Sequence, residues 1–238
     1  MRMSPTVLRM FASLVFFLSG SRPSAAESVA DDTRLEADSE IVVVGLGDQF
    51  RLTGKQLRAA VTEFRKGRSS YAPDSKLLFR VRVGERDGLE LALWLGGQLV
   101  PLVLDADGSF TLPELGEGDL RLVANRGRTR ITVTPVILSV GTDDSHRRLG
   151  DLRLQCRVEW ALVRTEVSLF FAGIYEAAGG CASKRFDYFA SAGRAVASGR
   201  IHDGLVQRLL QTSPGGSFRP PISDRVLPND SQIELTFR

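Results

Sequence analysis

The side chains best suited to acid–base chemistry in this 238-residue chain are its two histidines, His146 and His202. Asp203 follows His202 directly, near the expected end of a strand, and the pair could serve as the general base of a hydrolase. Such a base needs a nucleophile within about 2.6–3.2 Å, and no sequence neighbour supplies an obvious one. His146 follows Asp143 and Asp144, which could offer ligands to a metal, although a solvated linker explains the same composition. We therefore expect no metal and no cofactor, and the hydrolase stays an alternative.

Two further motifs resemble ligand-binding loops without completing them. Residues 105–109 (DADGS) begin like a calcium-binding loop, but the glycine is fourth rather than sixth and Gly116 occupies position twelve. Residues 45–47 (GLG) begin like a dinucleotide fingerprint, but Phe50 stands where the third glycine is required. The first motif predicts a tight turn, because glycine accepts a positive φ and aspartate bonds to its own backbone. The second predicts no nucleotide site.

Residues 1–26 have the composition of a secretory signal peptide. Arg2 and Arg9 supply positive charge, an apolar stretch follows at 10–18, and Ser24-Ala25-Ala26 offers small residues for cleavage before Glu27. Nine apolar residues reach only about 14 Å as a helix, too short for a hydrocarbon core of about 30 Å. We predict a secreted or periplasmic protein without stable membrane insertion once the signal is removed.

Removing residues 1–26 also changes the charge balance of the chain. The full sequence has 31 Lys and Arg against 28 Asp and Glu, a formal net charge of +3. Residues 1–26 contain three arginines and no acid, so the remainder carries 28 charges of each sign. Such a chain lacks the positive excess with which proteins bind nucleic acid, and we predict no such partner. The arginines, 27 against four lysines, alternate with acids and are expected on solvated strand faces.

Cys156 and Cys181 are the only cysteines in the sequence. In an oxidising compartment, two cysteines and no others predict one intramolecular disulfide. They form no C-x-x-C motif, which argues against a reactive thiol. The bond would join residues separated by 25 positions.

The first predicted elements are a leader, a strand and a helix. Residues 27–40 are polar and acidic, which predicts a disordered leader, and residues 41–46 (IVVVGL) predict a strand. Thr53 and Gln56 have the spacing of a capping box. Apolar residues at helical spacing then predict a core-packing helix that ends near Gly67: Leu57, Ala60, Val61 and Phe64.

From residue 77 onward the apolar residues alternate, which is the period of a strand with one buried face. The expected strands lie at residues 77–83, 89–95, 99–104, 109–112, 120–122 and 131–134. The first two surround a glycine-containing loop and are expected to pair as a hairpin, and so are the third and fourth. This spacing is typical of a β-sandwich or small barrel, which we predict for residues 41–138.

Apolar periodicity stops at residues 139–150, which we predict as a linker to an α+β domain at residues 151–238. Residues 152–162 (LRLQCRVEWAL) alternate most regularly and predict a strand with Cys156 facing the core. Residues 167–174 predict a helix ended by Gly179-Gly180, which the disulfide would fasten to that strand. Weaker strands are predicted at 184–189 and 194–201, and residues 232–238 predict a closing strand. The predicted fold class is α+β and rich in strands.

Trp94 is the candidate binding residue of the sequence. It lies in the polar phase of its strand, opposite in parity to the neighbouring leucines. An outward-facing tryptophan could stack on a sugar or dock a partner, and a sheet covered on both faces would bury it equally well.

Residues 104–115 (LDADGSFTLPEL), followed by 118–122 (GDLRL), resemble part of the carboxypeptidase regulatory-like domain. The motif of that family runs roughly D-x-D-G-x-F-x-L-x-x-L-x-x-G-x-Y-x-L, and Leu120 stands here in place of the usual aromatic residue. The resemblance implies a transthyretin-like β-sandwich that serves as a noncatalytic accessory module. It carries no catalytic residue over to this chain.

The sequence as a whole favours a noncatalytic binding or assembly protein at the cell envelope. We expect a protein or glycan partner, bound through an exposed sheet face or an edge strand. The grounds are the scarcity of histidine, the lack of a recognisable nucleophile setting and the lack of metal-ligand spacing. A concave pocket that joins His202 to a serine or carboxylate would favour the hydrolase, and a flat apolar patch around Trp94 would favour the binding protein.

Overall fold

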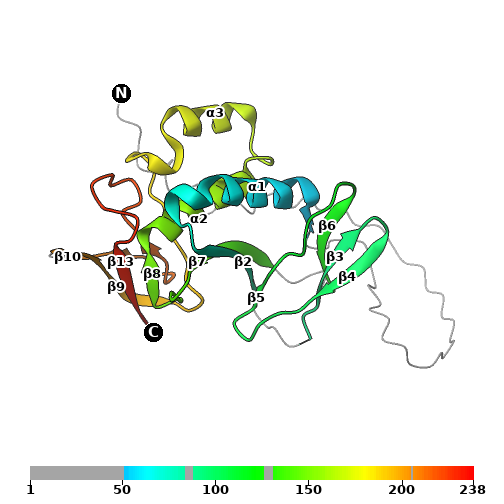
Figure 1. Ribbon diagram of the computed structural model, residues 1–238, viewed down its shortest axis with the longest axis horizontal. Coiled ribbons are helices and arrows are strands. Elements are labelled where there is room, and N and C mark those ends of the chain that lie inside the picture. Colours follow the sequence, from blue (N-terminus) through cyan, green and yellow to red (C-terminus); the bar gives the residue numbers. More distant parts are fainter. Residues whose placement is uncertain (1–50, 84–87, 126–130, 205) are drawn as a thin grey trace, which may run out of the picture. The chain divides into compact units, whose positions relative to one another are not determined.

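The computed structural model describes residues 51–83, 88–125, 131–204 and 206–238 (Figure 1). These residues all belong to one unit of the chain, Val43–Arg238. Its fold is α+β and rich in strands, with sandwich-like sheets and a helix held by a disulfide, which confirms the predicted fold class. None of the helices described in these ranges is long and apolar enough to cross a bilayer. The predicted signal peptide, leader and first strand lie outside the described residues.

The described elements follow one another as a short strand, a helix, seven strands, two α-helices, a 3-10 helix and five further strands. In chain order they are β1 (Arg51–Thr53), α1 (Gly54–Tyr71), β2 (Ser75–Arg82), β3 (Leu91–Leu95), β4 (Gln98–Leu102), β5 (Ser109–Phe110), β6 (Leu120–Ala124), β7 (Thr132–Ser139), β8 (His146–Arg148), α2 (Leu149–Val163), α3 (Leu169–Ala177), a 3-10 helix (Gly180–Ala182), β9 (Val196–Asp203), β10 (Val206–Leu209), β11 (Gln211–Thr212), β12 (Phe218–Arg219) and β13 (Gln232–Phe237).

Helix α1 begins as the sequence predicts and ends one turn later. Thr53 and Gln56 form the expected capping box: the Gln56 N–H donates to the Thr53 hydroxyl (3.3 Å) and the Thr53 N–H donates to Gln56 Oε1 (2.9 Å). The helix passes through Gly67, its predicted end, and stops at Tyr71. A Cβ at Gly67 would lie 2.6 Å from Leu154 Cδ1. This glycine therefore allows α1 to pack closely on α2.

Strands β1 to β7 form two antiparallel sheets, ordered β1-β6-β3-β4 and β5-β2-β7. Together with α1 and α2 they enclose the first of two hydrophobic cores. Its fully buried side chains include Leu57, Phe79, Leu93, Leu122 and Ile137.

Both predicted hairpins are wrong in their partners, although the strands exist. Strand β2 pairs with β7 and β5, and β3 pairs with β4 and β6. The physical reason is the Gly96-Gly97 turn, in which both residues have positive φ (54° and 98°), the geometry of a two-residue hairpin between β3 and β4. The turn at residues 105–109 forms as predicted, with the Gly108 N–H donating to the Asp105 carbonyl (2.8 Å), but it leads from one sheet to the other.

The strand predicted at residues 152–162 is wrong, because these residues form helix α2. The apolar residues that alternate in sequence also recur at helical spacing, and they divide between two faces of the helix. Leu154, Val158 and Leu162 pack in the first core, whereas Leu149, Leu152 and Cys156 pack in the second. Apart from Val158 and Val163, the helix consists largely of good helix formers such as Leu, Arg, Gln and Glu.

Strands β10-β9-β13-β8 form a third antiparallel sheet, which carries the second core. Strands β9 and β13 confirm the predictions for residues 194–201 and 232–238. The strand predicted at 184–189 is wrong, because the aromatic side chains there pack on other elements, as Phe186 does on the ring of Tyr175 (5.1 Å between centroids). Residues 139–150, predicted as a linker, contain the end of β7, all of β8 and the start of α2.

Helix α3 confirms the helix predicted at residues 167–174, and the chain turns at Gly179-Gly180 directly after it. Cys156 and Cys181 form the predicted disulfide, with sulfur atoms 2.06 Å apart. Since Cys156 lies on α2, the bond fastens the end of α3 to a helix rather than to a strand.

We expect the variant C156S/C181S to lose about 3.5 kcal/mol of unfolding free energy, because a 25-residue separation no longer constrains the unfolded chain. Denaturant unfolding followed by circular dichroism measures the loss. The wild-type protein in excess reductant is the matched control and should lose the same amount. Two free thiols detected by labelling of unreduced wild-type protein would contradict the prediction.

Candidate functional site

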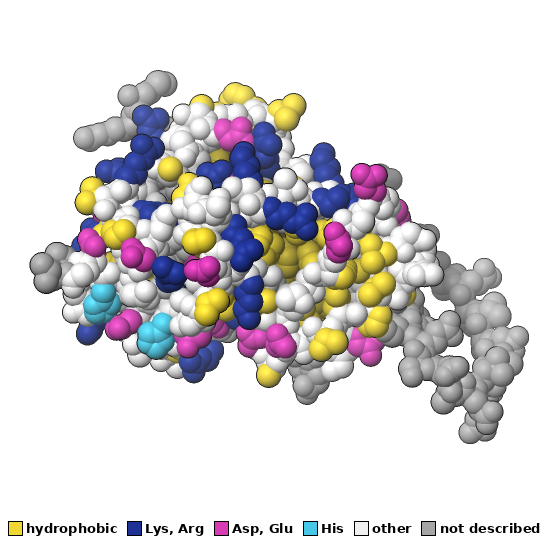
Figure 2. All heavy atoms as spheres, in the orientation of Figure 1, with side chains coloured by type: hydrophobic (Ala, Val, Ile, Leu, Met, Phe, Trp, Pro, Cys, Tyr) yellow, Lys and Arg dark blue, Asp and Glu magenta, His cyan; other side chains and the backbone are white. Residues whose placement is uncertain are grey.

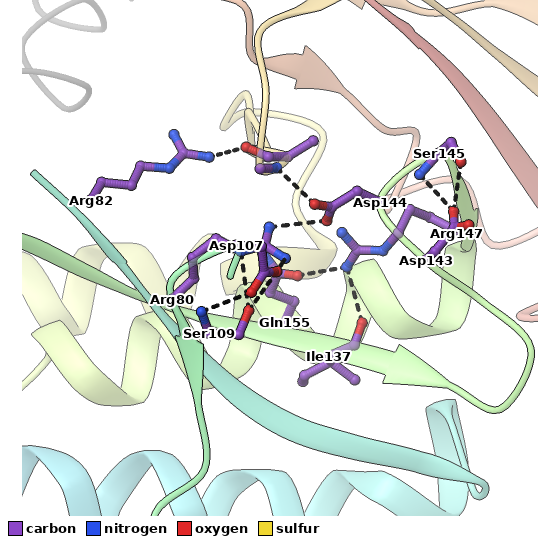
Figure 3. A network of polar contacts seen from close by, with 12 residues as sticks. Arg80, Arg82, Asp107, Ser109, Ile137, Asp143, Asp144, Ser145, Arg147 and Gln155 are labelled. Carbon is purple, nitrogen blue, oxygen red and sulfur yellow. Dashed lines mark hydrogen bonds and ion pairs between the residues drawn. The ribbon is translucent and has the colours of Figure 1, made fainter. Parts of the chain in front are cut away.

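A buried arginine fixes helix α2 against the sheet of the first core (Figure 3). Arg147 of β8 is fully buried, and its Nη2 donates to the carbonyl of Ile137 in β7 (3.0 Å) and to Gln155 Oε1 on α2 (2.8 Å). Its Nε and Nη1 have no hydrogen-bond partner within the described part of the chain. Burial lowers the pKa of Arg147, with Asp151 and Asp144 acting in the opposite direction. A guanidinium nonetheless stays protonated in proteins, so Arg147 is a buried positive charge.

A second arginine joins the turns around this network (Figure 3). The side chain of Arg80 in β2 is 4% exposed and pairs with Asp107 (2.6 Å) and with Asp144 (3.0 Å). The other oxygen of Asp144 accepts the backbone N–H of Gly193 (3.1 Å). Arg80 therefore connects β2, the turn at 105–109 and the chain before β9.

Two carboxylates of α2 complete the network. Asp151 is fully buried and accepts the backbone N–H (3.0 Å) and the hydroxyl (2.6 Å) of Ser139. Glu159 accepts a hydrogen bond from Gln155 Nε2 at 2.9 Å. Burial raises the pKa of Glu159 to about 7, although Gln155, Tyr188 and the nearby arginines act in the opposite direction. Glu159 therefore changes protonation near neutral pH.

One face of α2 presents Arg153, Arg157 and Trp160, and its helical C-cap residue Arg164 continues this face, at intervals of four, three and four residues. These intervals place side chains on the same side of a helix. The four residues line a pocket of about 750 Å³ between α1, α2, α3 and residues 222–229. Ligand-binding clefts have volumes of about 300–1,000 Å³. We call this feature the α2 pocket.

Arg153 fastens residues 222–229 to α2 and so builds one wall of the α2 pocket. Its Nε donates to the carbonyl of Ile222 (3.1 Å), Nη1 donates to Asn229 Oδ1 (2.6 Å), and Nη2 donates to the carbonyl of Asp224. Burial lowers the pKa of Arg153. All three nitrogens of this guanidinium therefore donate hydrogen bonds to residues 222–229.

The other two arginines of the pocket pair with acids on the neighbouring helices. Arg157 Nε donates to Glu63 Oε1 on α1 (2.7 Å), and its guanidinium lies over the ring of Tyr71 (5.5 Å). Burial lowers the pKa of Arg157, but Glu63 and Tyr71 raise it by more, so it lies above the ordinary value. Arg164 Nε pairs with Glu176 Oε1 on α3 at 2.7 Å.

An aromatic stack forms the floor between α2 and α3. The ring centroids of Trp160 and Tyr175 are 4.1 Å apart, and Tyr175 continues to Phe186. Burial raises the pKa of Tyr175 to about 12. The Trp160 Nε1–H is buried and has no hydrogen-bond partner within the described ranges. The Tyr175 hydroxyl lies 3.2 Å from the sulfur of Cys181, so the stack adjoins the disulfide.

The α2 pocket carries an excess of positive charge. Its lining contains the two acids already named, Glu63 and Glu176, and five cations: Lys66, Arg153, Arg157, Arg164 and Arg225. Lys66 and Arg225 are exposed, and neither forms an ion pair with another described residue. The rim of the pocket therefore favours an anionic partner.

Helix α3, beside this pocket, exposes an apolar face. Its large exposed side chains are Leu169 (91% exposed), Phe170 (73%), Phe171 (51%) and Ile174 (46%). Of the α3 residues only Ala172 is buried. At 100° per residue these side chains, with Gly173 and Ala177, cover a continuous arc that contains no charge. We call this arc the α3 face.

The residues that the sequence singled out lie elsewhere. Trp94 is half-buried in β3, opposite Leu99 and Arg121 of the neighbouring strands. It lines neither the α2 pocket nor the second described pocket, and the exposed apolar patch lies on α3 instead.

His202 lies on the outer face of the β10-β9-β13-β8 sheet, at the end of β9 next to Asp203. Its Nε2 is 3.2 Å from Glu234 Oε2 of β13, and the Gln207 amide lies at 3.5 Å. His146 is exposed on β8, with Nδ1 3.1 Å from the hydroxyl of Ser145. Neither histidine lines a described pocket, and the described residues contain no group of three metal-ligating side chains.

Helical spacing at 153, 157, 160 and 164 is the sequence pattern that would have found the α2 pocket. In a strand, Trp160 and Arg164 would face away from Arg153 and Arg157. Because the segment is predicted as a strand, the predicted fold does not place these four side chains on one face.

Comparisons with protein-family models, with curated proteins and with solved structures found no match to this chain. The resemblance of residues 104–122 to the carboxypeptidase regulatory-like domain therefore stays a prediction. Within the stretch that carries this resemblance, Asp107 of the turn at residues 105–109 forms an ion pair with Arg80.

We expect Asp151→Ala to lower the free energy of unfolding by about 3–5 kcal/mol, because it leaves the N–H and hydroxyl of Ser139 without their acceptor and removes one of the two acids that offset the buried charge of Arg147. Asp151→Asn keeps an acceptor oxygen and should lose less. Denaturant unfolding measures both variants. A loss below about 1 kcal/mol for the alanine variant would show that this contact does not hold α2.

We expect the stability of the protein to depend on pH through Glu159. Its pKa rises from 4.5 to about 7 on folding, so the folded state binds the proton more tightly. The resulting stabilisation is fully present below pH 4.5 and is lost as the pH rises through about 7, by up to about 3 kcal/mol. Denaturant unfolding of wild type and Glu159→Gln between pH 4.5 and 8 measures this contribution to the free energy of unfolding. Parallel pH profiles of the two proteins would contradict it.

Proposed function

We propose that this chain is an exported, noncatalytic binding protein of the cell envelope, and that it captures a protein partner on the α3 face. The observation that carries the proposal is the exposure of four large apolar side chains on one helix: Leu169, Phe170, Phe171 and Ile174. Large exposed apolar patches with polar surroundings mark interaction sites. Burying each such side chain contributes roughly 1.5–3 kcal/mol, so this face alone could drive association.

The charge beside the α3 face supports an acidic partner. The cations of the α2 pocket outnumber its acids, and Glu176 and Tyr175 of α3 belong to the pocket lining. Tyr175 and Glu176 lie on the side of α3 that is turned away from the α3 face, so a partner that covers this face must also extend past the edge of the helix to reach Arg164, Lys66 and Arg225. Complementary charge speeds association and selects the orientation of the complex.

The hydrolase alternative has weaker support. Glu234 does lie beside His202, but the pair sits on an exposed sheet face, and neither described pocket includes it. A general base needs a nucleophile within hydrogen-bond reach, and the described partners of His202 are a carboxylate and an amide. The hydrolase stays an alternative prediction centred on His202.

We expect the variant F170S/I174S to lose capture of the partner by about 100-fold, which corresponds to about 3 kcal/mol of apolar burial. The measurement uses chains that begin at residue 27 as bait in envelope extract, with retained proteins identified by mass spectrometry. The matched control is V103S/V226S, which changes two side chains that are 86% and 88% exposed outside α3.

Two outcomes would contradict this proposal. One is an identical set of retained proteins for wild type and F170S/I174S, with both folded to the same unfolding midpoint. The other is retention of wild type, but not of the variant, by protein-free anionic vesicles alone, which would make the α3 face a membrane contact.

A further inference from the structure

A second groove lies between α1 and the chain that follows β5. It has a volume of about 610 Å³ and is lined by Val61, Phe64, Leu77, Phe79, Leu112 and Leu115 on its apolar side. In Figure 2, hydrophobic side chains gather beneath α1, and lysine and arginine side chains lie beside them. We call this feature the α1 groove. It shares no lining residue with the α2 pocket or the α3 face.

The floor of the α1 groove is continuous with the first core. Phe79 is buried and stacks on Phe110, with ring centroids 5.9 Å apart. Phe64, Leu77, Leu112 and Leu115 are only partly buried, although they pack against that core. Apolar surface is therefore left open to solvent where an apolar ligand would cover it.

The rim of the α1 groove is positively charged. Arg65, Arg68 and Lys76 line it, all three are exposed, and none forms an ion pair with another described residue. Arg68 lies over the ring of Phe64 at 6.0 Å, so its charge is held at the edge of the apolar floor. Glu114 is the single acid among the lining residues. The arginines of the α2 face differ, because each is bound to an acceptor of the fold.

The wall opposite α1 favours an alkyl chain over an extended peptide. A peptide strand would need a continuous ladder of backbone hydrogen bonds along residues 112–115. Pro113 lies within this wall and has no N–H, so it interrupts such a ladder. An alkyl chain needs no hydrogen bonds and gains from apolar contact alone.

We propose that the α1 groove binds a free long-chain carboxylate. The alkyl chain lies on Phe64, Leu112 and Leu115, and the carboxylate pairs with Arg65, Arg68 and Lys76. Guanidinium groups suit this head group, because they bind carboxylates through two parallel hydrogen bonds. Residues 61–68 span about 10 Å of helix, enough to contact eight or more carbons of the chain. The proposal does not rest on the function assigned to the α3 face.

The test is a calorimetric titration of the chain from residue 27 onward with dodecanoate below its micellar concentration. We expect saturable binding of one dodecanoate per chain, weakened at least tenfold in R65Q/R68Q. The variant K55Q/K184Q changes two exposed lysines outside the groove and should bind like wild type. Dodecyltrimethylammonium, with the same chain and the opposite charge, should bind at least tenfold more weakly.

Three results would overturn the proposal. Equal affinity for dodecyltrimethylammonium would show unspecific apolar binding, and full affinity in R65Q/R68Q would show that the head group lies elsewhere. Binding to anionic phospholipid vesicles without binding of monomeric dodecanoate would assign the groove to a membrane surface. Because Arg65 and Arg68 are exposed, the R65Q/R68Q variant should keep the wild-type unfolding midpoint, which the same samples can verify.

Discussion

Helix α2 is buried on two sides, and the rest of the fold depends on this constraint. Leu154 and Val158 pack in the first core, and Leu152 and Cys156 pack in the second, so one helix serves both. The side that remains carries the arginines and Trp160 of the α2 pocket. A change that displaces α2 would therefore affect both cores and the pocket together, because cooperative units that share an element lose stability together.

Two arginines of this protein, Arg80 and Arg147, serve as buried connectors, whereas the other arginines whose burial is described are partly or fully exposed. The sequence favoured solvated strand faces for the arginines, but Arg80 and Arg147 are among its least exposed side chains. Each joins segments that are distant in sequence, as Arg153 does for the chain near Asn229. A guanidinium offers five donors in one plane, whereas a lysine ammonium cannot reach acceptors on several sides in this way. This geometry explains why arginine rather than lysine stands at these three connecting positions.

Patterns of residues close in sequence predict part of the fold correctly and another part wrongly. The capping box of α1, the turn at 105–109 and the end of α3 follow from residues close in sequence, and all three form. Helix α2 did not follow, because apolar residues at every second position also fit a helix with two buried faces. The candidate site depended on that helix and was missed with it. Strand pairing depends on the Gly96-Gly97 turn, whose two glycines with positive φ favour a hairpin between β3 and β4 over the predicted pairs.

The disulfide explains how α3 can keep an apolar face open to solvent. A helix normally holds its place by burying an apolar stripe, yet α3 buries only Ala172. Its position rests instead on Cys181, on the stacking of Tyr175 against Trp160 and on the ion pair between Glu176 and Arg164. These contacts all lie at the C-terminal half of α3. The covalent bond thus replaces core packing as the anchor of the helix, and the apolar side chains that such packing would bury remain exposed to solvent.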